Sequence, residues 1–400
     1  MRILTYTRLY PNAKMPEHGI FVARRVEAMA RQGGHQIEVV APVPYYPKFL
    51  PASGEWNALK LVPEVEERDG LNVYHPRYFN PPKIGMAKYG AWMAQGSYDL
   101  LYRLHKSDFQ FEVIDAHFVY PDGYAAVKLG QRLKRPVIVT ARGSDLTRNK
   151  NLPHIVPLLQ EVLRGAAQLI AVSEELRDNF LELGATPDKI HVIPNGVDTS
   201  FFTPMTREAA RRALHLKADD CWLVAVARLD RNKGQWLILE ALKKIGLDEL
   251  KNRRIKVALV GQGESRAELE KIAQAAGLGD IVHFAGQQNP EKIRIWYNAA
   301  NVNILASSRE GSPNVVLEAL ACGIPVLASG AGNNAAIIHA GSNGFVFPIE
   351  NAEALKIALL LALDHPWDRQ AIAASGSQRN WAAVAREVES VLELTTNHTR

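Results

Sequence analysis

The chain has 400 residues, of which 47% are hydrophobic and 22% are charged. This length is too great for one ordinary core and predicts two domains, and the average composition excludes a disordered or fibrous protein. The net charge of +5 favours anionic partners, though only weakly.

Two cysteines, Cys221 and Cys322, have neither disulfide nor zinc-ligand spacing. No apolar run approaches the ~18 residues that a membrane-spanning helix needs, and the first residues lack the apolar core of a secretory signal. We therefore expect a protein of the reducing cytoplasm.

Short β-branched runs alternate with amphipathic helical patterns along the first half of the chain. The predicted strands are 3–6, 36–40, 112–116, 136–140, 168–172 and 191–193, with helices such as 22–31 and 124–133 between them. The pattern restarts with strands at 222–227, 256–260, 281–284, 302–305, 325–328 and 344–347. Such alternation indicates α/β domains with parallel sheets that are covered on both faces.

A connector and a tail divide this pattern. Residues 193–204 carry the turn residues and prolines of a connector, so we place a boundary near Pro204. We predict two doubly wound, Rossmann-like domains, 1–204 and 205–365, which face each other across a cleft. A helical tail, 366–400, is expected to return toward the N-terminal domain and pack across both. Ligands of such sheets lie beyond the carboxyl ends of the strands.

The most informative segment follows the predicted strand 302–305. Ser312 is a good N-cap, Pro313 suits the first helical position, and Gly323 can end the helix just before Pro325. A helix should therefore begin here at the carboxyl edge of the sheet.

Two carboxylates flank the start of this helix, with Glu310 on the loop and Glu318 inside the helix. Carboxylates can accept hydrogen bonds from sugar hydroxyls, while a helix N-terminus binds anions. The backbone N–H groups near the helix start are those of Gly311, Asn314 and Val315. An acidic turn that only complements the helix dipole would explain the same residues.

The pattern Glu310-x7-Glu318, within a run that ends Glu-Ala-x-Ala-Cys-Gly, resembles the signature of family 4 retaining glycosyltransferases of the GT-B fold. Segments 192–198, 225–234, 260–264 and 283–286 match the family in the same order, so the likeness covers nearly the whole chain. Segments 115–123 and 140–145 look most like transferases that build cell-surface polysaccharides, including the teichuronic acid type.

The resemblance implies a role for each matched residue. Glu318 would bind the ribose hydroxyls, Arg228 and Lys233 the diphosphate, and Glu310 the donor sugar near its reacting carbon. His117 would hold a sugar hydroxyl beside the anomeric centre. The remaining donor-site candidates are Gly19, Gly311, Ser312, Pro313, Asn314 and Val315, and the acceptor-side candidates are Arg142 and Asp145.

Fixed cations agree with chemistry that needs no metal. Arg228 closes the predicted strand 222–227 and Lys233 follows a short polar turn, so both should lie at the carboxyl edge of the sheet. Together with a helix N-terminus they can stabilise the charge of a departing diphosphate. We therefore predict no cofactor and no metal. Solvated surface cations, and a structural role for His117, are the simpler alternatives.

One loop departs from the family pattern. After the predicted strand 325–328 the chain has Gly332-Asn-Asn-Ala-Ala336, where the family has Gly-Gly-x-Pro-Glu. A catalytically silent nucleotide-binding or scaffold protein on the same fold is therefore an alternative, as is a sugar epimerase or phosphorylase. A nicotinamide dehydrogenase fits less well, because Gly261-Gln-Gly263 is followed by Arg266 where that fingerprint needs a small residue.

The resulting prediction is a hexosyltransferase that acts with retention, by front-face displacement. It would move a sugar from a nucleotide diphosphate donor to a glycan or lipid-linked acceptor in cell-surface polysaccharide synthesis. The basic and aromatic stretch 83–106 is either an amphipathic helix that contacts an anionic membrane at its inner face or an ordinary packed helix. No nucleic-acid partner is expected.

Overall fold

The computed structural model describes residues 1–32, 34–45, 55–81 and 85–397. The chain divides into two compact units: unit 1 comprises residues up to Asn195 and again from Trp381, and unit 2 comprises Gly196–Asn380. The change of unit falls at Asn195, before the predicted boundary at Pro204. The connector residues after Asn195 belong to unit 2 because they pair there, with Val197 N donating to the Arg379 carbonyl at 2.9 Å.

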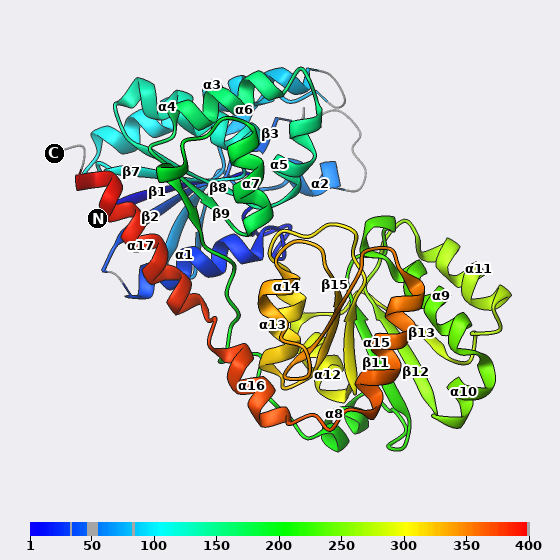
Figure 1. The fold of residues 1–400 in the computed structure, drawn as a ribbon. Coiled ribbons are helices and arrows are strands. Elements are labelled where there is room, and N and C mark those ends of the chain that lie inside the picture. The colour runs from blue at the N-terminus through cyan, green and yellow to red at the C-terminus, as the bar shows by residue number, and fades with distance from the viewer. Residues whose placement is uncertain (33, 46–54, 82–84, 398–400) are drawn as a thin grey trace. The chain divides into compact units, whose positions relative to one another are not determined.

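Unit 1 is built on an eight-stranded sheet in the order β10-β9-β8-β7-β1-β2-β5-β4 (Figure 1). Its strand pairs are parallel except for β4 with β5. The strands are β1 (Arg2–Tyr6), β2 (Gln36–Val40), β4 (Val65–Arg68), β5 (Leu71–Tyr74), β7 (Val113–His117), β8 (Val137–Ala141), β9 (Gln168–Ala171) and β10 (Ile190–Val192). A separate short pair joins β3 (Val43–Pro44) to β6 (Arg77–Tyr78).

Helices connect these strands. They are α1 (Ile20–Gln32), α2 (Glu55–Lys60), α3 (Tyr89–Lys106), α4 (Tyr124–Leu133), α5 (Ser144–Thr147), α6 (Val156–Gly165), α7 (Glu174–Glu182) and, from the end of the chain, α17 (Trp381–Asn397). Short helical turns occupy Met86–Lys88, Val119–Gly123, Asn149–Asn151 and Pro187–Lys189. Within the described ranges, no helix of either unit has both the length and the apolar character needed to cross a bilayer.

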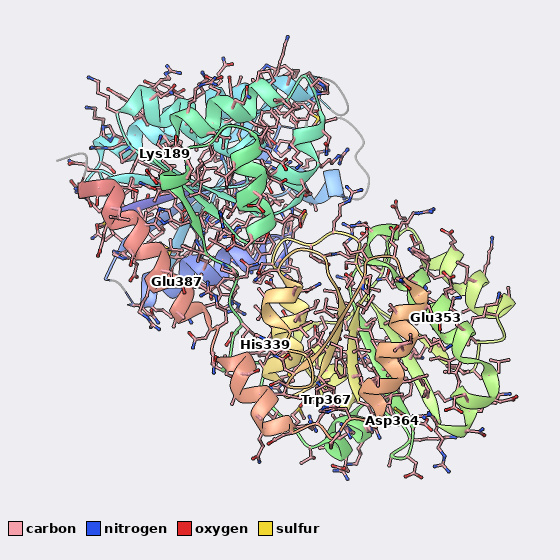
Figure 2. All side chains as sticks on the ribbon, viewed as in Figure 1. Lys189, His339, Glu353, Asp364, Trp367 and Glu387 are labelled. Atoms are coloured by element: carbon pink, nitrogen blue, oxygen red, sulfur yellow. The ribbon has the colours of Figure 1, made fainter. Side chains whose placement is uncertain are left out.

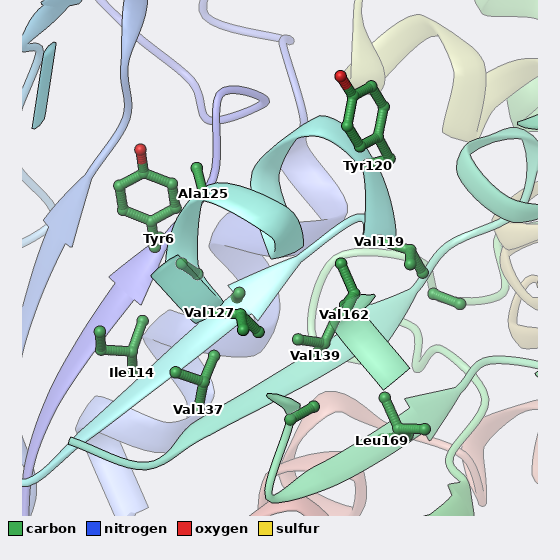
Figure 3. Packing of buried hydrophobic residues seen from close by; sticks show 14 of the residues in the cluster. Tyr6, Ile114, Val119, Tyr120, Ala125, Val127, Val137, Val139, Val162 and Leu169 are labelled. Carbon is green, nitrogen blue, oxygen red and sulfur yellow. The ribbon is translucent and has the colours of Figure 1, made fainter. Parts of the chain in front are cut away.

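Both faces of the unit 1 sheet are buried, as a parallel sheet requires. Alternate residues of a strand point to opposite faces, so Leu4 and Tyr6 of β1 enter a core with α3, α4, α6 and α7. Ile3 enters a second core with α1 and α17. Figure 3 shows the first core, with residues of β7, β8 and α4 among those labelled.

Unit 2 contains a six-stranded sheet, with strand pairs that are all parallel, in the order β13-β12-β11-β14-β15-β16 (Figure 1). The strands are β11 (Cys221–Val226), β12 (Ile255–Val260), β13 (Val282–Gly286), β14 (Val302–Leu305), β15 (Val326–Ser329) and β16 (Gly344–Phe347). The helices are α8 (Arg207–Ala213), α9 (Gln235–Ile245), α10 (Leu247–Asn252), α11 (Arg266–Ala275), α12 (Pro290–Ala299), α13 (Asn314–Ala321), α14 (Asn334–Ile337), α15 (Ala352–Asp364) and α16 (Arg369–Ser377).

The unit 2 sheet is likewise covered on both faces. One core includes residues of α9, α11 and α15, and the other includes residues of α12, α13 and α16. Trp367, which follows α15 (Figure 2), donates its indole N–H to the Ala362 carbonyl at 2.7 Å and lies edge-on to Phe345 of β16. The aromatic contact holds the end of α15 against the last strand of the sheet.

The predicted series of strands is confirmed, with ends that shift by one or two residues. The strands β3 to β6, between Val43 and Tyr78, were not predicted. Segment Val65–Arg68 alternates weakly and carries charged residues, because β4 is an exposed edge strand with little apolar signal. The predicted tail is divided, since α16 packs on α13 in unit 2 and α17 packs on α1 in unit 1.

The Gly261-Gln-Gly263 sequence after β12 has a structural explanation. A Cβ at Gly261 would lie 2.0 Å from the Ala227 carbonyl oxygen, and one at Gly263 would lie 2.2 Å from that of Leu229. Leu229 N in turn donates to the Gln262 carbonyl at 3.1 Å. The glycines therefore let two backbones meet at the carboxyl edge of the unit 2 sheet.

Replacing Gly263 by alanine should destabilise the protein, because the new Cβ would overlap the Leu229 carbonyl. We expect a loss of roughly 1–3 kcal/mol, the usual cost of overpacking. Gly279→Ala is the matched control, since a Cβ there meets no atom within 4 Å, and it should change stability by less than about 1 kcal/mol. Thermal unfolding followed by circular dichroism checks both variants, and equal midpoints would contradict the close approach.

Candidate functional site

The strand order of unit 2 reverses once along its sheet. β11 lies between β12 and β14, so the order reverses between β11 and β14. In doubly wound sheets, ligands bind at such a reversal, because the connections leave it toward opposite faces. The loops after β11, β14 and β15 meet here, and together with helix α13 they carry most of the predicted site residues.

Lys233 and Glu310 come together at this reversal. Lys233 Nζ donates to Glu310 Oε1 at 2.7 Å, and both side chains are largely buried. The close approach depends on Gly234, which has φ +70° and whose Cβ would lie 2.0 Å from the Ala306 carbonyl oxygen. The loop after β11 is thereby held against the loop after β14, and the charged pair lies where they meet.

The loop 332–336, whose sequence differs from the family pattern, lies directly against Glu310. A Cβ on Gly332 would lie 2.5 Å from the Glu310 carbonyl oxygen, and Gly332 has φ +59°. The neighbouring Asn333 N donates to the Gly311 carbonyl at 3.2 Å. The loop therefore keeps a glycine at the contact with Glu310, although the exposed Ala335 and Ala336 stand where the family has larger groups.

Arg228 is one of the exposed cations of this edge. Its side chain is 77% exposed, and its Nε lies 3.7 Å from Asp230 Oδ2. An exposed pair of this kind contributes little to stability. Arg228 is therefore a long cationic side chain at this edge that is not fixed by packing.

Helix α13 begins one residue later than predicted. Pro313 is its N-cap, with an extended ψ of 102°, and the helix starts at Asn314. Ser312 is thus outside the cap, so the predicted capping role of Ser312 is wrong, and Asn314 and Val315 form the first turn. The far end is as predicted, because Gly323 has φ +75° and Ile324 N donates back to the Ala319 carbonyl at 3.0 Å.

Glu318 lies on the second turn of α13, and a tyrosine that the sequence analysis missed holds it in place. Tyr297 of α12 is fully buried and donates its hydroxyl to Glu318 Oε2 at 3.0 Å. Burial raises the pKa of Glu318 to about 7, because it disfavours the charged carboxylate, and the Tyr297 hydrogen bond offsets this only in part. A ligand that donates hydrogen bonds to this carboxyl would favour its ionised form.

In unit 1 the strand order reverses between β1 and β7, and His117 is the last residue of β7. The His117 side chain is fully buried, and Arg142 Nη2 lies 2.7 Å from its Nδ1. A guanidinium can only donate, so Nδ1 accepts and the neutral ring carries its proton on Nε2. Burial, together with the nearby Arg25, lowers the pKa of His117 to about 3.

A buried ion pair between Arg25 and Asp115 lies next to His117. Arg25 of α1 donates from Nη2 to both oxygens of Asp115 at 2.6 and 2.7 Å, and from Nη1 to Thr140 Oγ1 at 3.0 Å. Asp115 and His117 lie two residues apart on β7 and so share one face of the sheet. Burial alone would raise the pKa of Asp115, but Arg25 and His117 bring it below the usual range.

Among the described residues, His117 Nε2 has no hydrogen-bond partner, although Asp115 Oδ2 lies 3.4 Å away. This N–H group is fully buried, so a ligand oxygen could accept from it only after the atoms that cover it move. The ring cannot act as a proton acceptor in this arrangement, because its other nitrogen is occupied by Arg142.

The acceptor-side candidates shape the neighbouring loop. Asp145 Oδ1 accepts from Arg142 N at 3.1 Å and Gly143 N at 2.7 Å, and Oδ2 accepts from Val119 N at 2.7 Å. Asp145 is therefore a buried organiser of backbone, while Arg142 spans His117 and Asn195.

Gly19 lies elsewhere on the same edge, at the start of α1. It has φ +70°, and a Cβ there would lie 2.1 Å from the Leu9 carbonyl oxygen. The connection between β1 and α1 therefore folds back on itself, with its end at Gly19 against its beginning at Leu9. Only glycine permits this approach.

The structure thus brings the predicted donor-side residues other than Gly19 to one edge of unit 2, whereas Gly19, His117, Arg142 and Asp145 lie at one edge of unit 1. Sequence reasoning gave no role to Tyr297, Arg25 or Asp115. The sequence signal that could have identified Arg25 is its position among the apolar residues that α1 buries between Val22 and Met29. Across the described ranges, no group of three or more His, Cys, Asp or Glu side chains is arranged as a metal site.

Two family models together match almost the whole chain. Residues 206–393 match the model described as "Glycosyl transferases group 1", and residues 19–201 match "Glycosyltransferase Family 4". The teichuronic acid biosynthesis glycosyltransferase TuaC of Bacillus subtilis is 28% identical over 90% of this chain and 88% of its own length. The D-inositol 3-phosphate glycosyltransferase of Frankia alni is 28% identical over 82% of this chain and 86% of its own.

Solved structures share the fold at low identity. A sucrose-phosphate synthase from Thermosynechococcus elongatus superposes with a TM-score of 0.76 and 20% identity, covering 98% of this chain and 99% of that one. The Anabaena protein HepE, solved in complex with UDP, gives a TM-score of 0.73 and 19% identity, with 98% and 100% covered.

Breaking the Arg25–Asp115 pair should strongly destabilise the protein, because the remaining charge would be buried without a partner. We expect Arg25→Met and Asp115→Asn each to lower the free energy of unfolding by roughly 3–5 kcal/mol. The control Arg24→Met changes a half-exposed neighbour on the same helix and should cost less than about 1 kcal/mol. Urea unfolding measures all three.

The pH dependence gives a further check on the same pair. The pKa of Asp115 is lowered in the folded state, so its stabilising contribution is present above the unfolded value of about 4 and is lost on acidification. The difference between the parent and Asp115→Asn should therefore shrink as the pH falls below about 4. If Arg25→Met and Asp115→Asn were as stable as Arg24→Met, the Arg25–Asp115 pair would not stabilise this edge of the sheet.

Proposed function

The chain belongs to the glycosyltransferases of the GT-B fold, and we propose that it transfers a sugar from a nucleotide diphosphate donor with retention of anomeric configuration. The observation that carries the proposal is the convergence of Lys233, Glu310 and Glu318 at the strand-order reversal of unit 2. A cation, a helix N-terminus and two carboxylates at one edge match the diphosphate and the hydroxyl groups of such a donor.

Each donor group has a counterpart in unit 2. Glu318, held by Tyr297, would accept the two ribose hydroxyls, and the first turn of α13 would lie near the phosphates. Lys233 and the exposed Arg228 would bind the diphosphate. Glu310 would then exchange its contact with Lys233 for hydroxyls of the donor sugar.

We propose that the reaction needs no metal or cofactor. The bond from the anomeric carbon to the diphosphate oxygen breaks, and the charge that develops on the diphosphate is stabilised by Lys233, Arg228 and the N–H groups of α13. The acceptor hydroxyl attacks from the same face and gives its proton to the departing phosphate. In this front-face displacement no side chain has to act as a base.

The state of His117 fits that mechanism. Its Nδ1 accepts from Arg142, its Nε2–H is free of partners among the described residues, and its pKa is far below neutral. It would therefore serve as a neutral hydrogen-bond donor to a sugar oxygen, and not as the general base. Arg142 and Asp145 would fix this orientation by holding the adjoining loop.

The relatives suggest the acceptor class. TuaC is named for teichuronic acid biosynthesis, and WcaL of Salmonella typhimurium, 25% identical over 71% of both chains, is named for colanic acid biosynthesis. We propose a glycan or lipid-linked acceptor in cell-surface polysaccharide synthesis. The loop at 332–336 contacts Glu310, so it should influence which donor sugar is accepted.

We also propose peripheral contact with an anionic membrane through the end of α3. Tyr102, Arg103 and Lys106 are exposed there, and the Lys106 ammonium lies 5.8 Å from the Tyr102 ring centre. Basic and aromatic side chains at one end of a helix suit the headgroup region of a bilayer. The predicted stretch began at Lys83, which lies outside the described residues, and the buried face of α3 packs on α4.

Donor binding should strengthen as the pH rises from about 6 to about 8. The raised pKa of Glu318 means that the free carboxyl is partly protonated near neutrality, whereas hydrogen bonds from ribose favour the carboxylate. A sugar-linked diphosphate has no titrating group in that range, so the slope reports on the protein. Calorimetric titration in EDTA against a panel of nucleotide sugars, UDP-glucose first, measures it.

Two variants separate the roles of the residues. Glu318→Gln should weaken binding by roughly 10- to 100-fold and abolish the pH slope, because it cannot ionise. Lys233→Ala should weaken binding but keep the slope. A Gln variant with unchanged affinity, or with the parent slope, would contradict the assignment of Glu318 to the donor.

Membrane contact predicts co-sedimentation with anionic vesicles at low salt. Each basic residue near such a surface contributes about 1 kcal/mol, so Arg103→Gln with Lys106→Gln should weaken partitioning by roughly 10- to 30-fold. The matched control removes two lysines of unit 2 in the same way, Lys243→Gln with Lys244→Gln. If the parent protein stays in the supernatant, or if both double variants behave alike, this surface does not bind lipid.

A further inference from the structure

A cavity lies in unit 1, at the carboxyl ends of β1, β2 and β5, and its lining includes no residue that was given a role above. Its volume is about 170 Å³. At roughly 30 Å³ for each water, it has room for about six waters, which is the scale of one monosaccharide ring. It lies next to the strand-order reversal between β1 and β7, where ligands of doubly wound sheets are found.

Arg8 provides a fixed cation at this cavity. It follows β1, and the buried Asp122 Oδ1 accepts from Arg8 N at 2.6 Å, while Asp122 Oδ2 lies at ion-pair distance, 3.3 Å, from Arg8 Nε without a hydrogen bond. Among the described residues, the two terminal guanidinium nitrogens of Arg8 have no partner. These two N–H groups point the same way from a planar fork, which is the geometry that binds a carboxylate or phosphate with two hydrogen bonds.

The lining of the cavity also offers neutral polar groups. Asn80 Oδ1 is buried without a hydrogen-bond partner among the described residues, and Asn80 Nδ2 lies 3.4 Å from the Tyr78 hydroxyl. A buried acceptor without a partner costs free energy, so a ligand hydroxyl that donates to Asn80 would be favoured. Apolar surface from Pro42 and Leu59 completes the lining and suits the C–H face of a sugar ring.

The cavity wall is preorganised. His75 is buried, with Nδ1 3.0 Å from the Ala41 carbonyl and Nε2 2.8 Å from Glu66 Oε1. Both ring nitrogens are therefore occupied, which fixes the ring and joins the ends of β2 and β5 through one side chain. A rigid wall lowers the entropy that a ligand would lose by ordering the site.

We propose that this cavity binds an anionic sugar unit of the acceptor, with its carboxylate or phosphate on Arg8 and a hydroxyl on Asn80. The proposal rests on the glycosyltransferase function proposed above, and it adds the chemical class of the acceptor. The anionic group would fix the position of the acceptor, while the reacting hydroxyl lies outside the cavity.

Ligand-observed NMR on the full chain tests the proposal with four probes: glucuronic acid, glucose 6-phosphate, glucose and inorganic phosphate. We expect the acidic sugars to bind at least ~10-fold more tightly than glucose, and Arg8→Gln to remove that preference. Asn80→Ala, which breaks no ion pair, should weaken both acidic sugars. Arg177→Gln removes an exposed arginine of the same unit and is the control.

Each outcome either identifies the anionic group of the acceptor or overturns the proposed site. Stronger binding of glucuronic acid than of glucose 6-phosphate, or the reverse, identifies the anionic group. Equal binding of glucose and the acidic sugars, or binding of inorganic phosphate as tight as that of the sugars, would overturn the proposal. Nucleotide-sugar binding is measured on the same samples. If the protein binds the nucleotide sugar but no acidic sugar, this inference fails and the donor site stands. If it binds neither the nucleotide sugar nor an acidic sugar, the proposed function fails.

Discussion

Parallel strand order is the constraint on which both candidate sites depend. In unit 2 it sets β11 and β14 side by side, so that the loops after them leave from one edge. Gly234 then lets those loops touch at Ala306, and Lys233 meets Glu310 across the contact. The charged pair is thus a product of the sheet topology and one backbone approach, and any larger side chain at Gly234 would separate its two members.

The two units stabilise charge in different ways. In unit 2 the important charges are partly accessible: Arg228 is exposed, and Glu318 is of intermediate exposure, although the burial of its carboxyl raises its pKa to about 7. In unit 1 the charges are deeply buried, and Arg25 pairs with Asp115 beneath His117. Accessible charges can exchange their partners for those of a ligand, whereas buried pairs hold a shape. This division agrees with a donor site in unit 2 and a preorganised surface in unit 1.

The sequence was sufficient for the sheets, the helices and the segment Glu310 to Glu318, because apolar periodicity and turn residues are local signals. It was insufficient for β3 to β6, among which the charged residues of β4 hide an edge strand, and for the cap of α13, which is Pro313 and not Ser312. Contacts between distant residues had no local signal at all. Lys233 and Glu310, and likewise Tyr297 and Glu318, meet only because the fold brings their loops and helices together.

The central claim is that a donor at the Lys233–Glu310 edge loses its sugar with retention and without metal. The most direct measurement is an NMR time course of donor turnover in EDTA, with water as the acceptor, that follows both the released nucleoside diphosphate and the anomer that forms first. The account predicts that an α-linked donor yields the α-anomer first and that Glu310→Gln abolishes release. Formation of the β-anomer first, or release that requires a divalent cation, would contradict it.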